Sequence, residues 1–172
     1  MPKPGLEQYV DSVLLSLLDS KEGIALATGE VFKARLDGAR VWTLGNGGSL
    51  AIAQHFAQDI LKMHGVRAQC LNDASVITAY SNDEGFENSF YGALAKLIDP
   101  RDLIFVFSCS GKSPNYKKIF EFPNKKVAVV GTDGGFMKEM ADVCIHVQHD
   151  DYRVCESAFG IVADLINIGL ED

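Results

Sequence analysis

Basic side chains are few in this sequence of 172 residues. Its 16 Lys and Arg are outnumbered by 23 Asp and Glu, which gives a formal net charge of −7 at pH 7. Surfaces that attract duplex DNA or anionic lipid carry an excess of basic side chains. The balance therefore argues against a general nucleic-acid binder, and we expect no nucleic-acid and no membrane partner.

Long hydrophobic runs are absent as well. No uninterrupted apolar stretch approaches the roughly 20 residues of a membrane-spanning helix, and Met1 to Pro4 are followed by no hydrophobic signal region. We therefore expect a cytoplasmic protein. Hydrophobic residues make up 47% and charged residues 23% of the chain, which is ordinary globular usage. This length and composition predict a single domain over residues 1–172.

Cysteine is rare and unevenly spaced. The four cysteines form no CxxC pair and none of the dense patterns of disulfide-stapled secreted domains; they are Cys70, Cys109, Cys144 and Cys155. We expect four reduced thiols, in agreement with a cytoplasmic location.

Helical and extended patterns alternate along the chain. Residues 6–36 have apolar side chains at helical spacing, which predicts two N-terminal helices with a break near Ser20 to Gly23. Short apolar strands are then predicted at 41–44, 67–71, 103–107, 126–130 and 143–147. Helices are predicted at 50–63, 74–80 and 85–98, from Pro114 onward, up to Ala141 and at 153–170, with a turn at 81–83.

Several predicted strands are apolar along their whole length, which is typical of a parallel sheet covered by helices on both faces. We therefore expect a doubly wound α/β domain, with N-terminal helices at 1–38 and an α/β core at 39–172. Ligands of such folds bind at the carboxyl ends of the strands. The loops after Leu44, Phe107 and Val130 are rich in Gly and hydroxyl residues, and they are the candidate binding sites.

The loop Gly45–Ser49 has the sequence GNGGS and lies between a predicted strand and a helix that Ser49 is expected to cap. Its glycines leave backbone N–H groups open at the positive end of the helix dipole, which suits an anion. It lacks the spacing of the GxGxxG and Walker motifs, so no nucleotide cofactor is expected. A tight turn without a ligand explains the glycines equally well.

The loop Ser108–Ser113 places three hydroxyl groups around Gly111, just before the predicted helix start at Pro114. Hydroxyls and free N–H groups form a phosphate cradle that relies on hydrogen bonds and a helix dipole, since Lys112 is its only charge. The alternative is a solvated turn with a helix cap. Two such loops at equivalent strand ends favour the binding interpretation.

The motifs GNGGS, HFAQD, SND, SCSGKS and GTDGG follow one another over nearly the whole chain. In this order they resemble the sugar isomerase (SIS) domain, and most of all its phosphoheptose isomerase branch. The loop Ser-x-Ser-Gly-x-Ser is the most specific element. The resemblance implies a three-layer αβα sandwich with a five-stranded, flavodoxin-like parallel sheet. It places phosphosugar contacts at Asn46, Gly47, Gly48, Ser49, Asn82, Asp83, Ser108, Cys109, Ser110 and Ser113.

The same resemblance implies a phosphorylated sugar as ligand. It also implies a homotetramer whose active sites are built across subunit interfaces. The N-terminal helices at 1–38 are expected to lie in that oligomer interface.

Isomerisation of an aldose to a ketose moves a proton between neighbouring carbons, so it needs a base and a group that polarises the carbonyl. His55 and Asp59 are four residues apart and share one helix face. Such a pair can bind Zn²⁺, or it can be a histidine hydrogen-bonded to its neighbour. The resemblance implies zinc binding by this pair and an acid/base role for its carboxylate.

The closing helix departs from the family pattern. Where the resemblance places a Gln and, eight residues later, a metal-binding His, this chain has Cys155 and Ala163, and Asp59 replaces a Glu. Ala163 neither ligates nor titrates, which removes a general acid/base. We expect a recomposed site with His55, Asp59 and Glu156 as catalytic residues. Zn²⁺ is expected on His55, Asp59 and Cys155, with Glu156 as the alternative third ligand. The simpler alternatives are a helix-dipole partner for Glu156 and a buried apolar thiol for Cys155.

These residues are compatible with two functions. The first is an aldose–ketose isomerase of the phosphoheptose (sedoheptulose 7-phosphate) isomerase type with an altered acid/base set. The second is a non-catalytic phosphosugar sensor, or an interaction scaffold resembling replication-initiator-associating proteins. The phosphate loops together with Ala163 favour binding without turnover, whereas His55 and Asp59 favour chemistry.

Overall fold

The computed structural model describes residues 5–171, so the expectation for Met1 to Pro4 lies outside the described residues. The strands are β1 (Arg40–Gly45), β2 (Arg67–Cys70), β3 (Leu103–Ser108), β4 (Lys126–Val130) and β5 (Val143–His146). The α-helices are α1 (Leu6–Leu18), α2 (Lys21–Leu36), α3 (Gly48–His64), α4 (Ala74–Glu84), α5 (Tyr91–Leu97), α6 (Lys117–Phe120), α7 (Gly135–Met140) and α8 (Tyr152–Gly169), and two 3₁₀ turns are η1 (Phe86–Asn88) and η2 (Pro114–Tyr116). Over residues 5–171, no helix is both long and apolar enough to span a bilayer.

The five strands form one parallel sheet in the order β2-β1-β3-β4-β5. This order confirms the doubly wound, flavodoxin-like α/β prediction. The strand order reverses between β1 and β3, which pair directly, with Gly45 opposite Phe107. The loops that leave these two strands therefore lie side by side at the switch point of the sheet, where ligands of such folds bind.

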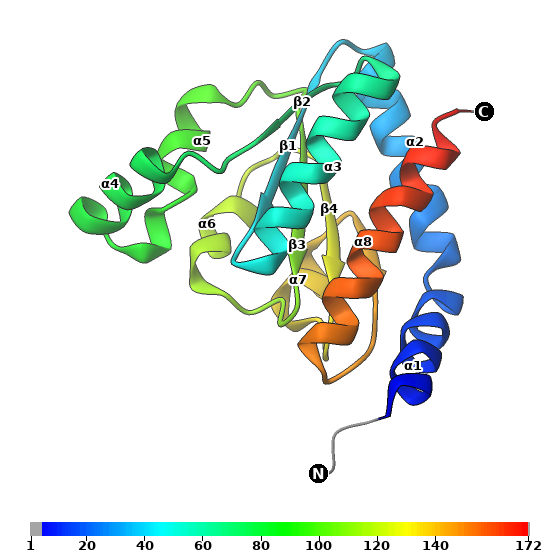
Figure 1. Cartoon of the computed structure of the whole chain (residues 1–172). Coiled ribbons are helices and arrows are strands. Elements are labelled where there is room, and N and C mark those ends of the chain that lie inside the picture. Colours follow the sequence, from blue (N-terminus) through cyan, green and yellow to red (C-terminus); the bar gives the residue numbers. More distant parts are fainter. Residues whose placement is uncertain (1–4, 172) are drawn as a thin grey trace.

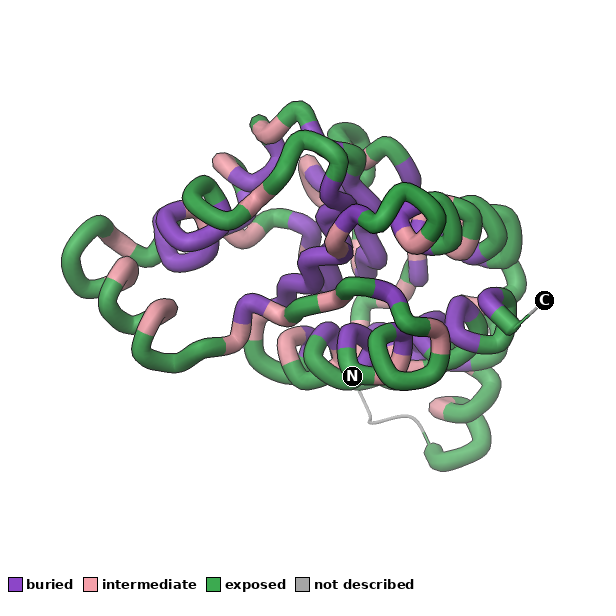
Figure 2. Tube along the Cα trace, turned by 90° about the horizontal axis from the view of Figure 1, so that it is seen from above, coloured by how far each residue is buried: buried purple, intermediate pink, exposed green. Residues whose placement is uncertain are grey.

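Helices cover both faces of the sheet, as Figure 1 shows. Alternate residues of each central strand point to opposite faces. Phe105 and Phe107 of β3 pack with α1, α2, α3 and α8, whereas Ile104 and Val106 pack with the layer from α5 to α7. The buried residues accordingly occupy the middle of the molecule in Figure 2. The three-layer αβα sandwich is confirmed.

Helix α1 is tied to the closing helix by one side chain. The hydroxyl of Tyr9 donates to the carbonyl of Arg153 (2.9 Å) and shares a hydrogen bond with the hydroxyl of Ser157 (2.7 Å). The N-terminal helices thus belong to the same layer as α8.

Three predicted segments differ from the structure. Residues 81–83 continue α4 rather than forming a turn, and the helix ends only at Gly85, whose φ of +91° a glycine adopts without strain. The predicted helix at 85–98 is split into η1 and α5. The helix expected from Pro114 consists of η2 and the four-residue α6, because Pro123 follows closely and disfavours helix in the residue before it.

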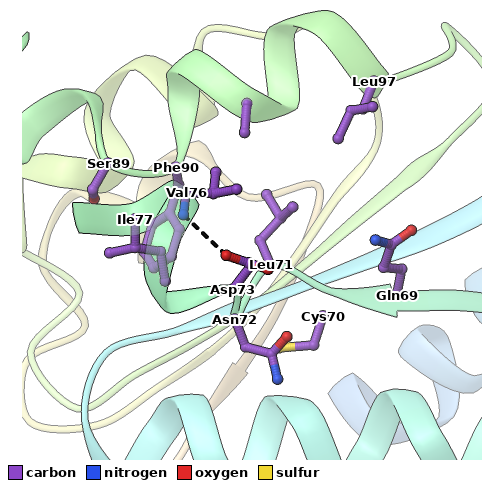
Figure 3. A pocket seen from close by; sticks show the side chains of 11 residues that line it. Gln69, Cys70, Leu71, Asn72, Asp73, Val76, Ile77, Ser89, Phe90 and Leu97 are labelled. Atoms are coloured by element: carbon purple, nitrogen blue, oxygen red, sulfur yellow. Dashed lines mark hydrogen bonds between the residues drawn. The ribbon is translucent and has the colours of Figure 1, made fainter. Parts of the chain in front are cut away.

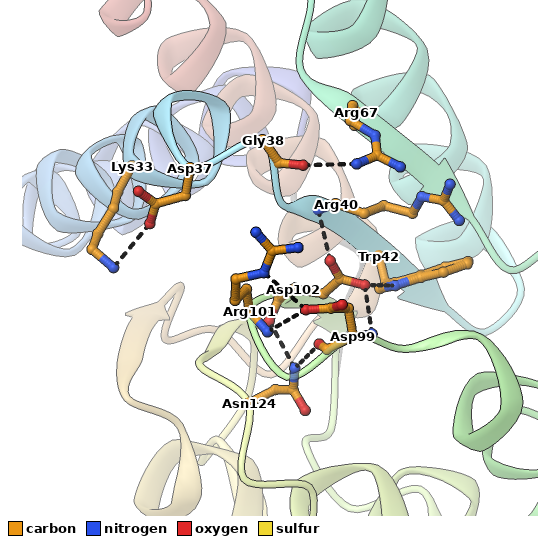
Figure 4. A network of polar contacts seen from close by, with 10 residues as sticks. All are labelled: Lys33, Asp37, Gly38, Arg40, Trp42, Arg67, Asp99, Arg101, Asp102 and Asn124. Carbon is orange, nitrogen blue, oxygen red and sulfur yellow. Dashed lines mark hydrogen bonds and ion pairs between the residues drawn. The ribbon is translucent and has the colours of Figure 1, made fainter.

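At the amino ends of the strands, opposite the two loops, a buried carboxylate accepts several hydrogen bonds (Figure 4). Asp102 accepts hydrogen bonds from the backbone N–H of Arg40 (2.8 Å), from Nε1 of Trp42 (2.9 Å) and from the N–H of Asp99 (3.0 Å). The amide of Asn124 donates to the carbonyls of Asp99 and Asp102. These contacts join β1 to the turn before β3 at the amino end of the strands.

Candidate functional site

The loop after β1 presents two free amides at the start of the 17-residue helix α3. Gly47, at the N-cap, has φ 56° and ψ −125°, a conformation open to glycine and to almost no other residue. The N–H groups of Ser49 and Leu50 bond back to the carbonyls of Asn46 and Gly47. Among the described residues, the N–H groups of Gly47 and Gly48 have no such acceptor. They lie at the positive end of the helix dipole, where an anionic or polar ligand group is favoured.

The side chains of Ser49 and Cys109 face each other underneath the two loops. Both are buried, and Ser49 Oγ lies 3.9 Å from Cys109 Sγ. Ser49 was expected to cap α3, but the helix begins at Gly48 and the hydroxyl makes no cap bond. Because both side chains are turned inward, these two residues offer a ligand their backbone rather than their side chains.

The loop after β3 is lined with hydroxyls, as expected. Ser108 Oγ accepts from the N–H of Gly111 (3.1 Å), and Ser110 Oγ accepts from the N–H of Lys112 (3.2 Å). Because these oxygens serve as acceptors, their own O–H groups stay available as donors. Lys112 is paired with Asp133 at 2.6 Å, so the cradle holds no free positive charge. The helix behind Ser113 is short, which makes its dipole weaker than the sequence suggested.

Asn82 and Asp83 lie in the last turn of α4. Their side chains are exposed, and Asn82 Nδ2 donates to Asp83 Oδ1 (2.7 Å). Figure 1 shows α4 projecting at the side of the sheet, and no residue of this helix is buried. Within residues 5–171, no side-chain hydrogen bond joins this pair to the two loops.

A cavity of about 340 Å³ opens beside the carboxyl end of β2 (Figure 3). Leu71, Val76 and Phe90 form its apolar walls, and Asp73 at its rim caps α4 by accepting from the N–H of Val76 (3.0 Å). None of the described residues that line it is basic. Because it has an acidic rim and no cation, this cavity is not suited to a phosphate.

A possible metal site lies between α3 and α8. His55 Nε2 is 3.2 Å from Asp59 Oδ2, and Asp164 of α8 joins the pair, with ligand atoms of all three within 4.8 Å of one another. In the part of the chain that the structure describes, this is the one such group of His, Cys, Asp or Glu. Three nitrogen and oxygen donors with an open side match the usual protein ligands of a catalytic zinc.

Cys155 is not part of this group, so the expected ligand set is corrected at one position. The residue is fully buried, and its Sγ donates to the carbonyl of His149 (3.1 Å). Cys155 precedes Asp164 by nine residues, which turns the two side chains about 180° apart on the helix. The thiol therefore points into the core beneath the loops.

There the thiol of Cys155 interacts with that of Cys109. This interaction and burial raise the pKa of the Cys109 thiol. The same interaction lowers the pKa of the Cys155 thiol. The pair is part of the packing under both loops, in agreement with the simpler interpretation of Cys155 as a small buried residue.

Glu156 reaches the first loop. Its carboxylate rests against the α-carbon of Gly48, so closely that a β-carbon there would lie only 2.4 Å from Oε1. The start of α8 thus places a half-buried carboxylate directly beside Gly48, one of the two residues with a free amide. A carboxylate in this position can take a proton from a bound polyol chain.

Comparison with known proteins identifies the family. The sequence profile described as "SIS domain" matches residues 8–131. The chain belongs to the SIS domain family. The matched segment includes both loops, His55 and Asp59, and it stops before α8.

Within the family, phosphoheptose isomerases are similar to this SIS domain chain. One from Trichlorobacter lovleyi is 36% identical and covers 82% of this chain and 78% of its own length. A solved phosphoheptose isomerase from Neisseria gonorrhoeae is 26% identical, with a TM-score of 0.88 over 96% of this chain and 94% of its own. Another from Francisella tularensis is 25% identical, with a TM-score of 0.87 over 96% of both chains.

Sequence reasoning missed two residues of this SIS domain site. Asp164 was visible only as a carboxylate two helical turns after Glu156, and a helical projection that included α3 would have been needed to pair it with His55. Asn115 gave no signal, because an amide in a short 3₁₀ turn has no distinctive spacing. Its partner in the structure is Asn46 of the first loop.

Proposed function

We propose that this SIS domain protein is a sugar-phosphate isomerase of the phosphoheptose isomerase type. The observation that carries the proposal is the Glu156 carboxylate held against Gly48, at a glycine loop that lies beside a hydroxyl-lined loop. In this proposal the two loops hold the phosphosugar and the carboxylate accepts a proton, which are the two requirements of aldose–ketose isomerisation. The similarity to phosphoheptose isomerases over most of the chain supports the same reaction class.

In this proposal the phosphate occupies the loop Ser108–Ser113. The hydroxyl hydrogens of Ser108, Ser110 and Ser113 donate to its oxygens. The amides of Gly47 and Gly48, with Asn46, hold the polyol end. This orientation follows from charge, because the Glu156 carboxylate beside Gly48 would repel a dianionic phosphate.

Glu156 then acts as the base. Its carboxylate takes the proton from the hydroxyl-bearing carbon next to the carbonyl, which leaves an enediolate. After the hydroxyl proton has moved to the former carbonyl oxygen, the protonated Glu156 returns its proton to the former carbonyl carbon. The N–H groups at the start of α3 stabilise the negative charge that develops on oxygen. Asn82 and Asp83 are further substrate contacts in this proposal, supplied by the projecting helix α4.

We further propose that His55, Asp59 and Asp164 hold Zn²⁺. Their donors fit a three-ligand zinc site, which would polarise a carbonyl when the metal is bound. His55 and Asp59 lie about 10 and 16 Å along α3 from its start at 1.5 Å per residue. A substrate anchored at the loops therefore reaches Glu156 of the same chain, whereas the His55 group is placed to serve a second chain.

The distribution of exposed apolar side chains supports this assembly. In the described part of the chain, nearly all of them lie on one layer, on α1, α2, α3 and α8; Phe86, Leu97 and Met140 are the exceptions. Exposed apolar side chains gathered on one layer are typical of an interface. We propose a cytoplasmic homotetramer in which one SIS domain spans residues 1–172 and the helices at 1–38 form the subunit contact.

Proton exchange tests the function. Purified protein of known metal content is incubated in D₂O with sedoheptulose 7-phosphate and other ketose phosphates, and deuterium at C1 and C2 is followed by NMR. We expect exchange with at least one of them and its loss in Glu156→Gln. Tight binding of a sugar phosphate without any exchange would instead support the phosphosugar sensor.

A further inference from the structure

Asn115 is fully buried in η2 and is bonded to the first loop through a reciprocal amide pair. Its Nδ2 donates to Oδ1 of Asn46 (3.0 Å), and its Oδ1 accepts from Nδ2 of Asn46 (3.1 Å). Asn115 Nδ2 also donates to Oγ of the buried Ser89 (3.2 Å). Three segments far apart in sequence are thereby joined at one point beside the switch of the sheet.

The same junction continues toward α4. Next to Ser89, Asn88 donates from Nδ2 to the carbonyl of Glu84 (2.6 Å) and accepts at Oδ1 from Nζ of Lys118 (2.7 Å). The end of α4 is therefore held by the segment that also holds Asn115. The loop after β1 and the end of α4, which carry the proposed sugar contacts, are connected by buried or half-buried polar side chains.

We propose that Asn115 is a positioning residue of the sugar site and acts through Asn46. An asparagine next to two glycines has little steric guidance for its rotamer. The reciprocal pair fixes the plane of the Asn46 amide, and it leaves one N–H and part of the oxygen of Asn46 for a ligand. This inference rests on the proposed function, since it assigns Asn46 a ligand contact.

Fixing the amide before the ligand arrives removes an ordering cost from binding. The affinity for a sugar phosphate should therefore depend on Asn115, although Asn115 itself stays covered by Asn46. Loss of two hydrogen bonds to one side chain corresponds to about a tenfold loss of affinity.

The test is a double-mutant cycle in the full chain with sedoheptulose 7-phosphate as the probe. We expect Asn115→Ala to weaken binding about tenfold by calorimetry, and to add no further loss when Asn46→Ala is already present. Ser89→Ala, a smaller truncation, should weaken binding in the same direction by a few-fold. Equal losses from Asn115→Ala in both backgrounds, or none in either, would overturn the inference.

Asn124→Ala is the matched control. Asn124 is also buried and donates two hydrogen bonds, but at the opposite edge of the sheet. It should lower stability without changing the affinity. An equal loss of affinity in this variant would show that Asn115 is merely structural.

A second measurement separates this inference from the proposed function. Hydrogen exchange of the Ser49 and Leu50 amides, which bond to the carbonyls of Asn46 and Gly47, should without ligand be about tenfold faster in Asn115→Ala and unchanged in Asn124→Ala. If the wild-type protein binds no sugar phosphate, the proposed function fails while the exchange still decides the positioning role. Unchanged exchange in Asn115→Ala contradicts that role.

Discussion

At the scale of single residues, substitution by Ala should have opposite effects at Gly45 and Gly48: the first should lower stability and the second should lower turnover. A β-carbon at Gly45 would lie 2.4 Å from backbone atoms of Ser49, which cannot move away, whereas one at Gly48 meets the flexible end of Glu156. We expect Gly45→Ala to lower the free energy of unfolding by about 2 kcal/mol or more. Gly48→Ala should keep the stability within about 1 kcal/mol but reduce turnover about 100-fold, because it displaces the carboxylate.

Urea unfolding and the isomerase assay, run on both variants, measure these effects. Gly29→Ala serves as the control, since a β-carbon there meets nothing within 4 Å. Normal turnover by Gly48→Ala would contradict the role given to Glu156.

The metal group gives a second residue-scale prediction. Asp164→Asn should weaken Zn²⁺ binding by more than about tenfold, since even outer-shell changes cost this much. Cys155→Ser should leave the affinity unchanged, because the Cys155 thiol faces the core. Competition with a chromophoric chelator measures both. Weaker Zn²⁺ binding by Cys155→Ser, with unchanged binding by Asp164→Asn, would show that Cys155 rather than Asp164 is the ligand.

At the scale of elements, the amino edge of the sheet depends on Asp102. Asp102→Ala leaves one buried and two half-buried N–H donors without their acceptor, which should cost about 3 kcal/mol in the free energy of unfolding. Asp99→Ala, in the same turn but with an exposed carboxylate paired to Arg101, should cost much less, because exposed ion pairs contribute little to stability. Denaturant titration compares the two, and equal losses would contradict this assignment.

Helix α8 begins with a carboxylate that has its own pH dependence. Hydrogen bonds from Arg153 lower the pKa of Asp151 to about 2. Because the folded-state pKa lies below the unfolded value of about 3.9, this contribution to stability is complete above pH 4 and is lost as the pH falls toward 2. Asn still caps a helix, so Asp151→Asn should show a smaller fall in stability between pH 5 and pH 2.5. An identical loss of stability in the wild-type protein and in Asp151→Asn would contradict this role of Asp151.

The elements themselves were largely predictable. Uninterrupted apolar strands and glycine-rich connections indicated the sheet, its doubly wound order and both loops. The end of α4 was misplaced because Ser81, Asn82 and Asp83 favour turns locally, whereas the glycine that stops the helix comes two residues later. Asp164 and Asn115 escaped prediction for a different reason: each acquires its role from a partner on another element, and such pairings depend on packing rather than on local pattern.

At the scale of the whole molecule, the exposed face of α1 predicts association. Leu6, Val10, Leu14 and Leu18 follow one another at a spacing of four residues and all are exposed. We expect the wild-type protein to sediment as a tetramer. Leu14→Glu combined with Leu18→Glu should reduce the assembly without unfolding the subunit, because neither side chain is in the core. Met140→Glu, on the other layer, is the control.

Analytical ultracentrifugation with circular dichroism measures the two variants. A monomeric wild-type protein, or a double variant that remains tetrameric, would contradict the proposed interface.

The hydrogen bonds from Tyr9 to the first turns of α8 connect the proposed subunit interface to the proposed catalytic carboxylate. The helix that carries the exposed apolar stripe is fastened, through Arg153 and Ser157, on either side of Glu156 along the chain. A shift of α1 upon dissociation would be passed to the carboxylate that moves the proton. Specific activity would then depend on enzyme concentration, and dilution alone would lower it.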